Sequence, residues 1–295
     1  MRADLIAYLR CPVCSETLAE QGAMLRCPRG HSFDQARQGY VHLSAGPPTH
    51  PGDTAEMVAA RAGFLAAGHY SFITAALVDA APDRGLVLDV GAGPGSHLGK
   101  VLDARPETVG LAIDVSKPAL RRAAKAHPRA GAILADAWRG LPVVDAGAAV
   151  LLNVFAPRNG PEFARVLAPD GALLVVTPTG DHLAELVTAL DLIRVDPAKD
   201  DRVAASLTPW FVETSSAVHE RVLALSRAEV TTLVGMGPSA WHTRPEELAS
   251  RVAELPEPYP VTAQVRVTRY SQVGLPLFTG WSCDPDSQGR GNHAP

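Results

Sequence analysis

Four side chains near the N-terminus have the types and the spacing of a metal site. Cys11 and Cys14 form a C-x2-C pair, Cys27 follows after twelve residues, and His31 after three more. Two short turns of this kind bring three thiolates and one imidazole to the corners of a tetrahedron, as in structural zinc sites. Such a set leaves no open position for a substrate, so we expect the zinc to stabilise a small unit. Disulfides are the alternative, and His31 argues against them.

A second stretch combines an apolar run with a glycine-rich turn. Residues 86–90 are apolar on both faces, apart from one acid, as in a buried parallel strand. Gly91, Gly93 and Gly95 follow, and they allow a sharp turn and the close approach of a ligand because they have no Cβ atom. Ser96 can cap the next helix, whose free N–H groups then face the ligand. The stretch therefore predicts a ligand-binding loop.

The spacing of these glycines distinguishes between two kinds of cofactor. From Asp89 the sequence reads D-x-G-x-G-x-G, whereas dinucleotide-binding folds use G-x-G-x-x-G. Pro94 also removes a backbone donor that a pyrophosphate would use. The pattern resembles motif I of the S-adenosylmethionine-dependent methyltransferases instead. Asp114 closes the next predicted strand, where a carboxylate can accept hydrogen bonds from both ribose hydroxyls.

Strand and helix patterns alternate along the rest of the chain. Strand patterns lie at 132–135, 148–153 and 172–177, and helical patterns lie near 116–126 and 161–166. This alternation predicts an α/β fold with a doubly wound parallel sheet, that is, a Rossmann-like class I methyltransferase core. Segments 217–225 and 260–270 are expected to add late strands, the last of them antiparallel. We expect a zinc-binding RNA-recognition domain at 1–44, a helical linker at 45–80, the methyltransferase domain at 81–279 and a disordered tail at 280–295.

Composition and charge narrow the class of protein. No apolar run reaches the roughly 18 residues that span a bilayer, and the N-terminus lacks a signal-peptide core, so we expect a cytoplasmic protein that does not enter a membrane. The net charge of −4 argues against a strongly basic nucleic-acid binder. Cations nevertheless gather at Lys117, Arg121 and Lys125, whose spacing places them on one helix face. That face is either simply solvated or a phosphate-binding stripe.

Polar and aromatic side chains follow the predicted strands at the edge where such folds bind ligands. The glycine loop would face the methionine part of the cofactor, and Asp114 the ribose. Asp136 would accept from the adenine amino group, with Trp138 beside the ring. Asn153 and Phe155 lie next to the expected methyl-transfer centre and are the candidates for catalysis. Asn153 can bond the edge of a base and Phe155 can stack on an extruded one, but no residue stands out as a general base.

Longer strings carry a closer resemblance, which runs from Cys11 to about Glu247. They are C-P-x-C…C-P-x-G-H, Gly39-Tyr40-Val41, Pro51-Gly52-Asp53, Phe64-Leu65, Gly68-His69-Tyr70, Ala156-Pro157, Thr177-Pro178, His182-Leu183, Met236-Gly-Pro238 and Arg244-Pro245-Glu246. With them the chain resembles the 23S ribosomal RNA (guanine-N1) methyltransferases, the family that includes the tylosin-resistance methyltransferase. The resemblance implies methyl transfer from S-adenosylmethionine to N1 of a guanine in a 23S rRNA hairpin. Nucleotide 748 is the expected target, with 745 as the alternative, and resistance to tylosin-type macrolides is the expected effect.

The resemblance also implies contacts and partners. Carried over by position, it adds Tyr70, Pro94 and His182 to the cofactor site. The expected cofactor-binding set is then Tyr70, Gly91, Gly93, Pro94, Gly95, Asp114, Asp136, Asn153 and His182. The resemblance also suggests a homodimer whose two zinc units flank a cleft. A chain of net charge −4 must concentrate its cations to hold RNA, so we expect an RNA-binding face that combines Arg10, Arg26 and Arg29 of the zinc unit with core residues such as Arg61.

Two alternatives remain open at this point. A methyltransferase acting on a quinone or an antibiotic sugar would use the same core, and the zinc unit argues against it. A non-catalytic zinc-knuckle RNA-binding protein with an inert core is the other, and the intact Asp89 and Asp114 argue against it. One departure is the string from Asn153 to Pro157, N-V-F-A-P, where enzymes acting on exocyclic amino groups carry N/D-P-P-Y/F. Guanine N1 is a ring nitrogen with a proton to lose, so its requirements differ.

Overall fold

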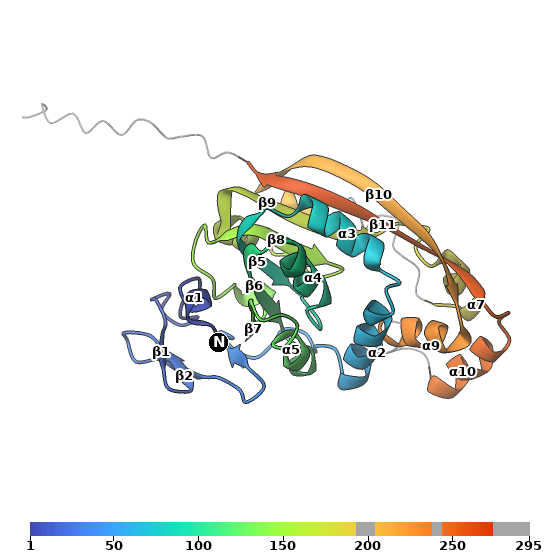
Figure 1. The fold of residues 1–295 in the computed structure, drawn as a ribbon, viewed down its shortest axis with the longest axis horizontal. Helices are drawn as coiled ribbons and strands as arrows, with labels where there is room; N and C mark the ends of the chain where they lie inside the picture. The colour runs from blue at the N-terminus through green and yellow to red at the C-terminus, as the bar shows by residue number, and fades with distance from the viewer. Residues whose placement is uncertain (193–203, 238–243, 274–295) are drawn as a thin grey trace, which may run out of the picture.

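A central eight-stranded sheet organises the molecule (Figure 1). The computed structural model describes residues 1–192, 204–237 and 244–273. The strand order is β10-β11-β9-β8-β5-β6-β7-β4. The bounds are β4 (Tyr40–His42), β5 (Arg84–Val90), β6 (Glu107–Asp114), β7 (Ala130–Leu134), β8 (Ala148–Val154), β9 (Leu167–Pro178), β10 (Phe211–Leu225) and β11 (Tyr259–Gln272).

The pairing of the strands confirms the predicted doubly wound fold. All pairs from β4 to β9 are parallel. β11 and β10 then add antiparallel strands at the β9 edge, as expected for the last strand. The order reverses at β5, which has β6 on one side and β8 on the other. In open α/β sheets the ligand crevice forms at such a reversal, outside the carboxyl ends of the strands.

Helices cover both faces of this sheet. They are α2 (Ala55–Ala66), α3 (Ser71–Ala80), α4 (Ser96–Ala104), α5 (Lys117–Ala123), α6 (Gly160–Val166), α7 (Ala184–Leu190), α9 (Arg227–Gly235) and α10 (Pro245–Ala253). Alternate residues of β5 point into two separate apolar cores. Val87 belongs to one core and Leu88 belongs to the other. This explains why the strand is apolar on both faces. No helix among the described residues is long and apolar enough to cross a membrane.

One local prediction needs correction. Ser96 is the first residue of α4 rather than its cap, because Gly95 takes the cap position with a φ of 78° and no side-chain bond. In the predicted helical linker at 45–80, α2 and α3 contribute Phe64 and Leu77 to the core. The predicted tail at 280–295 lies outside the described residues. The other predicted domain boundaries stay predictions.

The N-terminal unit shares its apolar core with the main sheet. It contains α1 (Ala3–Ile6) and a small antiparallel sheet of β1 (Ala19–Gln21), β2 (Met24–Arg26) and β3 (Ser32–Asp34). Leu5, Leu9 and Leu25 belong to the same buried cluster as Leu111 of β6. β4, which falls inside the predicted domain at 1–44, pairs with β7 of the main sheet. A unit this small cannot bury enough apolar surface alone, so it uses the larger core.

This sharing makes a testable prediction. Leu5 is fully buried and lies against Gly131 of β7, so Leu5→Ala leaves a cavity between the two units. We expect a loss of about 2–5 kcal/mol in the free energy of unfolding, with one cooperative transition in a urea titration. Val13→Ala, at a side chain that is 63% exposed in the same unit, is the control and should change little. Two separate transitions in the wild-type chain would contradict the shared core.

Candidate functional site

A cavity of about 930 Å³ opens at the carboxyl ends of the central strands. This volume lies within the range of small-molecule and cofactor sites. The predicted site residues that line it are Tyr70, Gly91, Pro94, Asp114, Asp136, Phe155 and His182, and Asp89 and Trp138 line it as well. The structure therefore brings together residues from β5, β6, β8, the turn after β7 and the segment after β9.

The glycines of the loop have different roles. Gly91 has a φ of 76°, and a Cβ atom there would lie 2.4 Å from the Cβ of Ala156 in the turn after β8. Gly95 instead packs against α5, because a Cβ atom would lie 3.0 Å from the Cα of Ala123. It does not line the cavity, so its part in the predicted cofactor set is to let α4 and α5 approach each other.

Asp114 fixes the glycine loop from the neighbouring strand. One carboxylate oxygen accepts from the Gly93 N–H at 2.8 Å and the other from the Ser116 N–H at 2.8 Å. Each oxygen keeps a second lone pair that can accept a hydrogen bond from a ligand. Burial raises the pKa of Asp114, although these two N–H donors oppose the shift.

Asp89 is a second buried carboxyl group in the same wall. It is 2% exposed at the end of β5. Burial, followed by the negative charge of Asp114, raises the pKa of Asp89 to about 7. Two carboxyl groups that disfavour each other's charge make this wall suited to a ligand that carries positive charge.

Asp136 already has several hydrogen-bond partners. Its Oδ2 accepts from the backbone N–H and the hydroxyl of Thr49, both at 2.7 Å, and Oδ1 accepts from the Trp138 N–H at 2.9 Å. Burial alone would raise the pKa of Asp136, but these donors lower it below its ordinary value. The residue thus fastens segment 49–53 to the turn after β7, and its contact with an adenine amino group stays a prediction.

Asn153 lies behind the cavity wall. Its side chain is fully buried and does not line the cavity. Its amide donates to the Pro157 carbonyl at 2.8 Å, which braces the turn after β8. This bond shapes the turn that carries Phe155, while the Oδ1 of Asn153 is buried without a hydrogen-bond partner among the described residues. The predicted contact of Asn153 with a base or a cofactor stays a prediction.

Phe155, the other catalytic candidate, does face the cavity. Its backbone has a φ of 53°, an uncommon conformation for a non-glycine residue, and its side chain is 43% exposed. Its ring centroid lies 5.9 Å from that of His182 and 6.3 Å from that of Tyr70. The three rings form one aromatic wall from segments far apart in the sequence.

His182 and Tyr70 are held in defined orientations. The Nδ1 of His182 lies 3.0 Å from the Gln264 carbonyl, which can only accept, so Nδ1 carries a proton and donates. Its Nε2 lies 3.4 Å from the Tyr70 hydroxyl. Burial raises the pKa of Tyr70 above its ordinary value, so the phenol stays neutral. Only the family resemblance, and no local pattern, pointed to these two residues.

Sequence reasoning missed the cover of the site. Residues 49–53, which fall inside the predicted helical linker at 45–80, line the cavity. Asp53 forms an ion pair with Arg61, whose Nη2 donates to the Met236 carbonyl at 2.7 Å. A Cβ atom on Gly52 would lie 2.9 Å from the Ser116 backbone, so the segment packs tightly. The sequence of such a segment, which contains glycine and proline, does not indicate whether it packs over a site or forms a free linker.

The cations expected to bind RNA are mostly paired. Arg10 contacts Asp145 at 3.2 Å and Arg29 contacts Glu16 at 3.7 Å, while Arg61 is bound to Asp53. In the part of the chain that the structure describes, the exposed cations of α5 and of the turn after it make no ion pair. They are Lys117, Arg121 and Arg122 in the helix and Lys125 beyond its end, so Lys125 does not continue the predicted helix face. The choice between a solvated face and a phosphate-binding stripe stays open for them.

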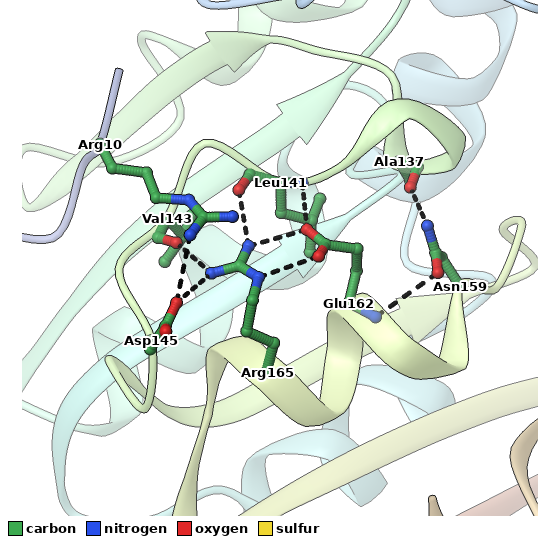
Figure 2. A network of polar contacts seen from close by, with 8 residues as sticks. All are labelled: Arg10, Ala137, Leu141, Val143, Asp145, Asn159, Glu162 and Arg165. Carbon is green, nitrogen blue, oxygen red and sulfur yellow. Dashed lines mark hydrogen bonds and ion pairs between the residues drawn. The ribbon is translucent and has the colours of Figure 1, made fainter. Parts of the chain in front are cut away.

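A polar network joins the N-terminal unit to the loops of the site (Figure 2). Arg165 of α6 contacts Asp145 at 2.6 Å and Glu162 at 2.7 Å, and Asp145 also holds Arg10, the residue before Cys11. Next to it, Asn159 donates to the Ala137 carbonyl at 2.7 Å. The turn after β7 and the loop after β8 are thereby held side by side.

Cys11, Cys14, Cys27 and His31 converge as predicted. Their ligand atoms all lie within 4.8 Å of one another, and the cysteines form no disulfide. The Cys14–Cys27 Sγ distance is 3.6 Å, and the His31 Nδ1 lies 3.5 Å from the Cys11 Sγ. Bonds of about 2.3 Å to sulfur and 2.0 Å to nitrogen give tetrahedral edges of roughly these lengths. The donor set therefore fits zinc.

Comparisons with known proteins agree with this geometry. Residues 9–44 match the family model of the RlmA N-terminal zinc ribbon. A Streptomyces fradiae relative named 23S rRNA (guanine(748)-N1)-methyltransferase is 49% identical over 91% of this chain and 98% of its own. A Micromonospora griseorubida relative named for 23S rRNA guanine-N1 methylation is 60% identical over 92% of this chain and 100% of its own.

The chain belongs to the 23S rRNA (guanine-N1) methyltransferase family. The predicted family, methyltransferase fold and zinc unit are thereby confirmed. Among solved structures, a Geobacter sulfurreducens S-adenosylmethionine-dependent methyltransferase with bound S-adenosylhomocysteine matches with 19% identity and a TM-score of 0.44, over 69% of this chain and 90% of its own. Membership favours the RNA methyltransferase over the small-molecule enzyme and the inert RNA-binding protein.

The zinc ribbon of this methyltransferase can be tested by metal analysis. We expect one zinc per chain, lost in Cys14→Ser, with a lower unfolding temperature for the whole chain because the ribbon and the sheet share a core. Cys283→Ser, at a position outside the described residues and outside the ligand pattern, is the control and should keep the metal. Absence of zinc from the purified wild-type protein would contradict the site.

The role of Asp114 can be tested by calorimetry with S-adenosylmethionine. Asp114→Ala removes the acceptor of the Gly93 and Ser116 N–H groups, so we expect binding to weaken by about 1–3 kcal/mol. Asp79→Ala, at an exposed carboxylate of α3, is the matched control. Equal affinity of Asp114→Ala and the wild type would show that this carboxylate does not serve the cofactor site.

Proposed function

We propose that the chain transfers a methyl group from S-adenosylmethionine to N1 of guanine 748 in a 23S rRNA hairpin. The observation that carries the choice of nucleotide is the 49% identity to the Streptomyces fradiae enzyme over nearly all of both chains. Resistance to tylosin-type macrolides and action in the cytoplasm, where ribosomes are assembled, belong to the same proposal.

The residues of the cavity suit the methyl donor. S-adenosylmethionine supplies an activated methyl group on a sulfonium, so the ligand brings positive charge to the wall that holds Asp89 and Asp114. In this proposal the Asp114 oxygens accept from the ribose hydroxyls while they hold the Gly93 N–H. Tyr70 and His182 line the same cavity, and Asp136 binds segment 49–53, which lines it as well. The protein's contribution is orientation and charge.

The acceptor base has to leave its stack to reach the cavity. An extruded base is recognised by stacking on aromatic side chains, and two exposed rings line this cavity. Phe155 is 43% exposed and Trp138 is 50% exposed. In our proposal they hold the guanine with N1 toward the methyl group. The bond from sulfur to the methyl carbon breaks as the bond to N1 forms, which leaves S-adenosylhomocysteine, and the N1 proton passes to water.

The assembly is part of the proposal as well. We propose a homodimer in which the zinc ribbons of two copies flank the RNA. The zinc ribbon is bound to the core by the hydrogen bond from Arg10 to Asp145, so it would hold a fixed position relative to the cavity. Sedimentation of the purified protein as a monomer, with and without RNA, would argue against this arrangement.

The methylated nucleotide can be located by primer extension on 23S rRNA. N1-methylguanine cannot form a Watson–Crick pair, so we expect reverse transcriptase to stop next to nucleotide 748 after incubation with the protein and S-adenosylmethionine. A transcript with adenine at that position is the control and should give no stop. A stop at nucleotide 745 would overturn the choice of target, and the lack of any new stop would overturn the proposed reaction.

A further inference from the structure

Arg158 is a cation in the cavity wall that has no side-chain partner within the described ranges 1–192, 204–237 and 244–273. It lies in the loop between β8 and α6 and lines the cavity. Among the described residues, its guanidinium group has neither a carboxylate within 4.0 Å nor a hydrogen-bond acceptor. Burial lowers the pKa of Arg158, and nearby Tyr270 opposes the shift only in part. A partly desolvated cation with no counter-ion is costly unless a ligand supplies one.

The other arginines around the site are already satisfied. Arg61 is bound to Asp53 and to the Met236 carbonyl. Arg165 is bound to Asp145 and Glu162 (Figure 2). Unlike these two arginines, Arg158 has a positive charge that a bound molecule could neutralise.

The surroundings of Arg158 indicate the kind of molecule. Phe155, three residues earlier in the same loop, and Trp138, in the turn after β7, expose their rings at the same cavity. Asn159, next to Arg158, ties these two loops together through the Ala137 carbonyl at 2.7 Å. Stacking rings and a cation with no counter-ion among the described residues, in one cavity, are the features that bind one nucleotide through its base and its phosphate.

We propose that Arg158 binds a backbone phosphate of the nucleotide whose guanine enters the cavity. The inference rests on the proposed function, because it takes RNA as the substrate. The carboxylate of S-adenosylmethionine is the alternative anion that could bind Arg158. The exposed rings in the same cavity favour the phosphate, since the carboxylates proposed to hold the cofactor, Asp89 and Asp114, lie on β5 and β6, whereas Arg158 lies in the loop after β8. Arg158 is then a positioning residue that fixes the extruded nucleotide.

The test compares Arg158→Ala and Arg158→Lys with the wild type in filter binding of a 23S rRNA hairpin over a salt series. For Arg158→Ala we expect a dissociation constant about tenfold higher and a salt slope smaller by about 0.7–0.9, the value for one phosphate contact. Arg158→Lys should recover part of the affinity. Lys100→Ala, at an exposed cation of α4 paired with Asp103, is the control and should keep the wild-type slope.

A chemically modified RNA separates a phosphate contact from a general loss of structure. Hairpins with one neutral methylphosphonate next to the target guanine should bind the wild type more weakly. The Arg158→Ala protein should bind the modified and the unmodified hairpins with equal affinity. Calorimetry should give both proteins the same affinity for S-adenosylmethionine.

The results that overturn the inference differ from those that overturn the proposed function. An unchanged salt slope in Arg158→Ala, or no effect of any methylphosphonate on the wild type, removes the phosphate contact. Weaker S-adenosylmethionine binding with an unchanged slope would assign Arg158 to the cofactor carboxylate and would equally overturn it. The proposed function fails instead when the wild type gives no primer-extension stop. Binding is measured without methylation, so it tests Arg158 in either case.

Discussion

The pair of hydrogen bonds between Asp114 and the backbone N–H groups of Gly93 and Ser116 is the constraint on which the site depends. It joins the loop after β5 to the start of α5 across two neighbouring strands. The loop can approach Asp114 only because it is built from glycines with positive φ. The same carboxylate therefore shapes the cavity and offers its remaining lone pairs to a ligand.

The cover of the cavity depends on the same region. Ser116, whose N–H group Asp114 binds, donates its own hydroxyl to the Asp53 carbonyl at 2.8 Å. Asp53 in turn holds Arg61 beside the glycine loop. Segment 49–53 is thus anchored at one end by Asp136 and at the other by Ser116. The floor and the cover of the cavity are parts of one hydrogen-bonded structure.

Sequence reasoning succeeded where a local pattern has one physical meaning. The spacing of the zinc ligands and the apolar run before Gly91 both specify short-range geometry, and the structure reproduces them. It gave less where the outcome depends on packing between distant segments. Asn153 was placed beside the reaction centre because it ends a predicted strand, and that role stays a prediction; no local pattern indicates that its amide braces the turn after β8. Arg158 gave no signal, because the sequence of a loop does not show that an arginine will be partly buried and unpaired among the residues that the structure describes.

The joint core of the zinc ribbon and the sheet limits how this protein can be divided. β4 belongs to the ribbon in sequence and to the main sheet in space, and Leu9 pairs through its backbone with Val143 of the core. A recombination event or an engineered fusion at residue 44 would cut through one hydrophobic interior instead of a flexible joint. Ribbon and core are therefore expected to evolve as a matched pair, with changes on one side of the interior compensated on the other. Exchange of ribbons between relatives would require the facing residues of β6 and β7 to be exchanged with them.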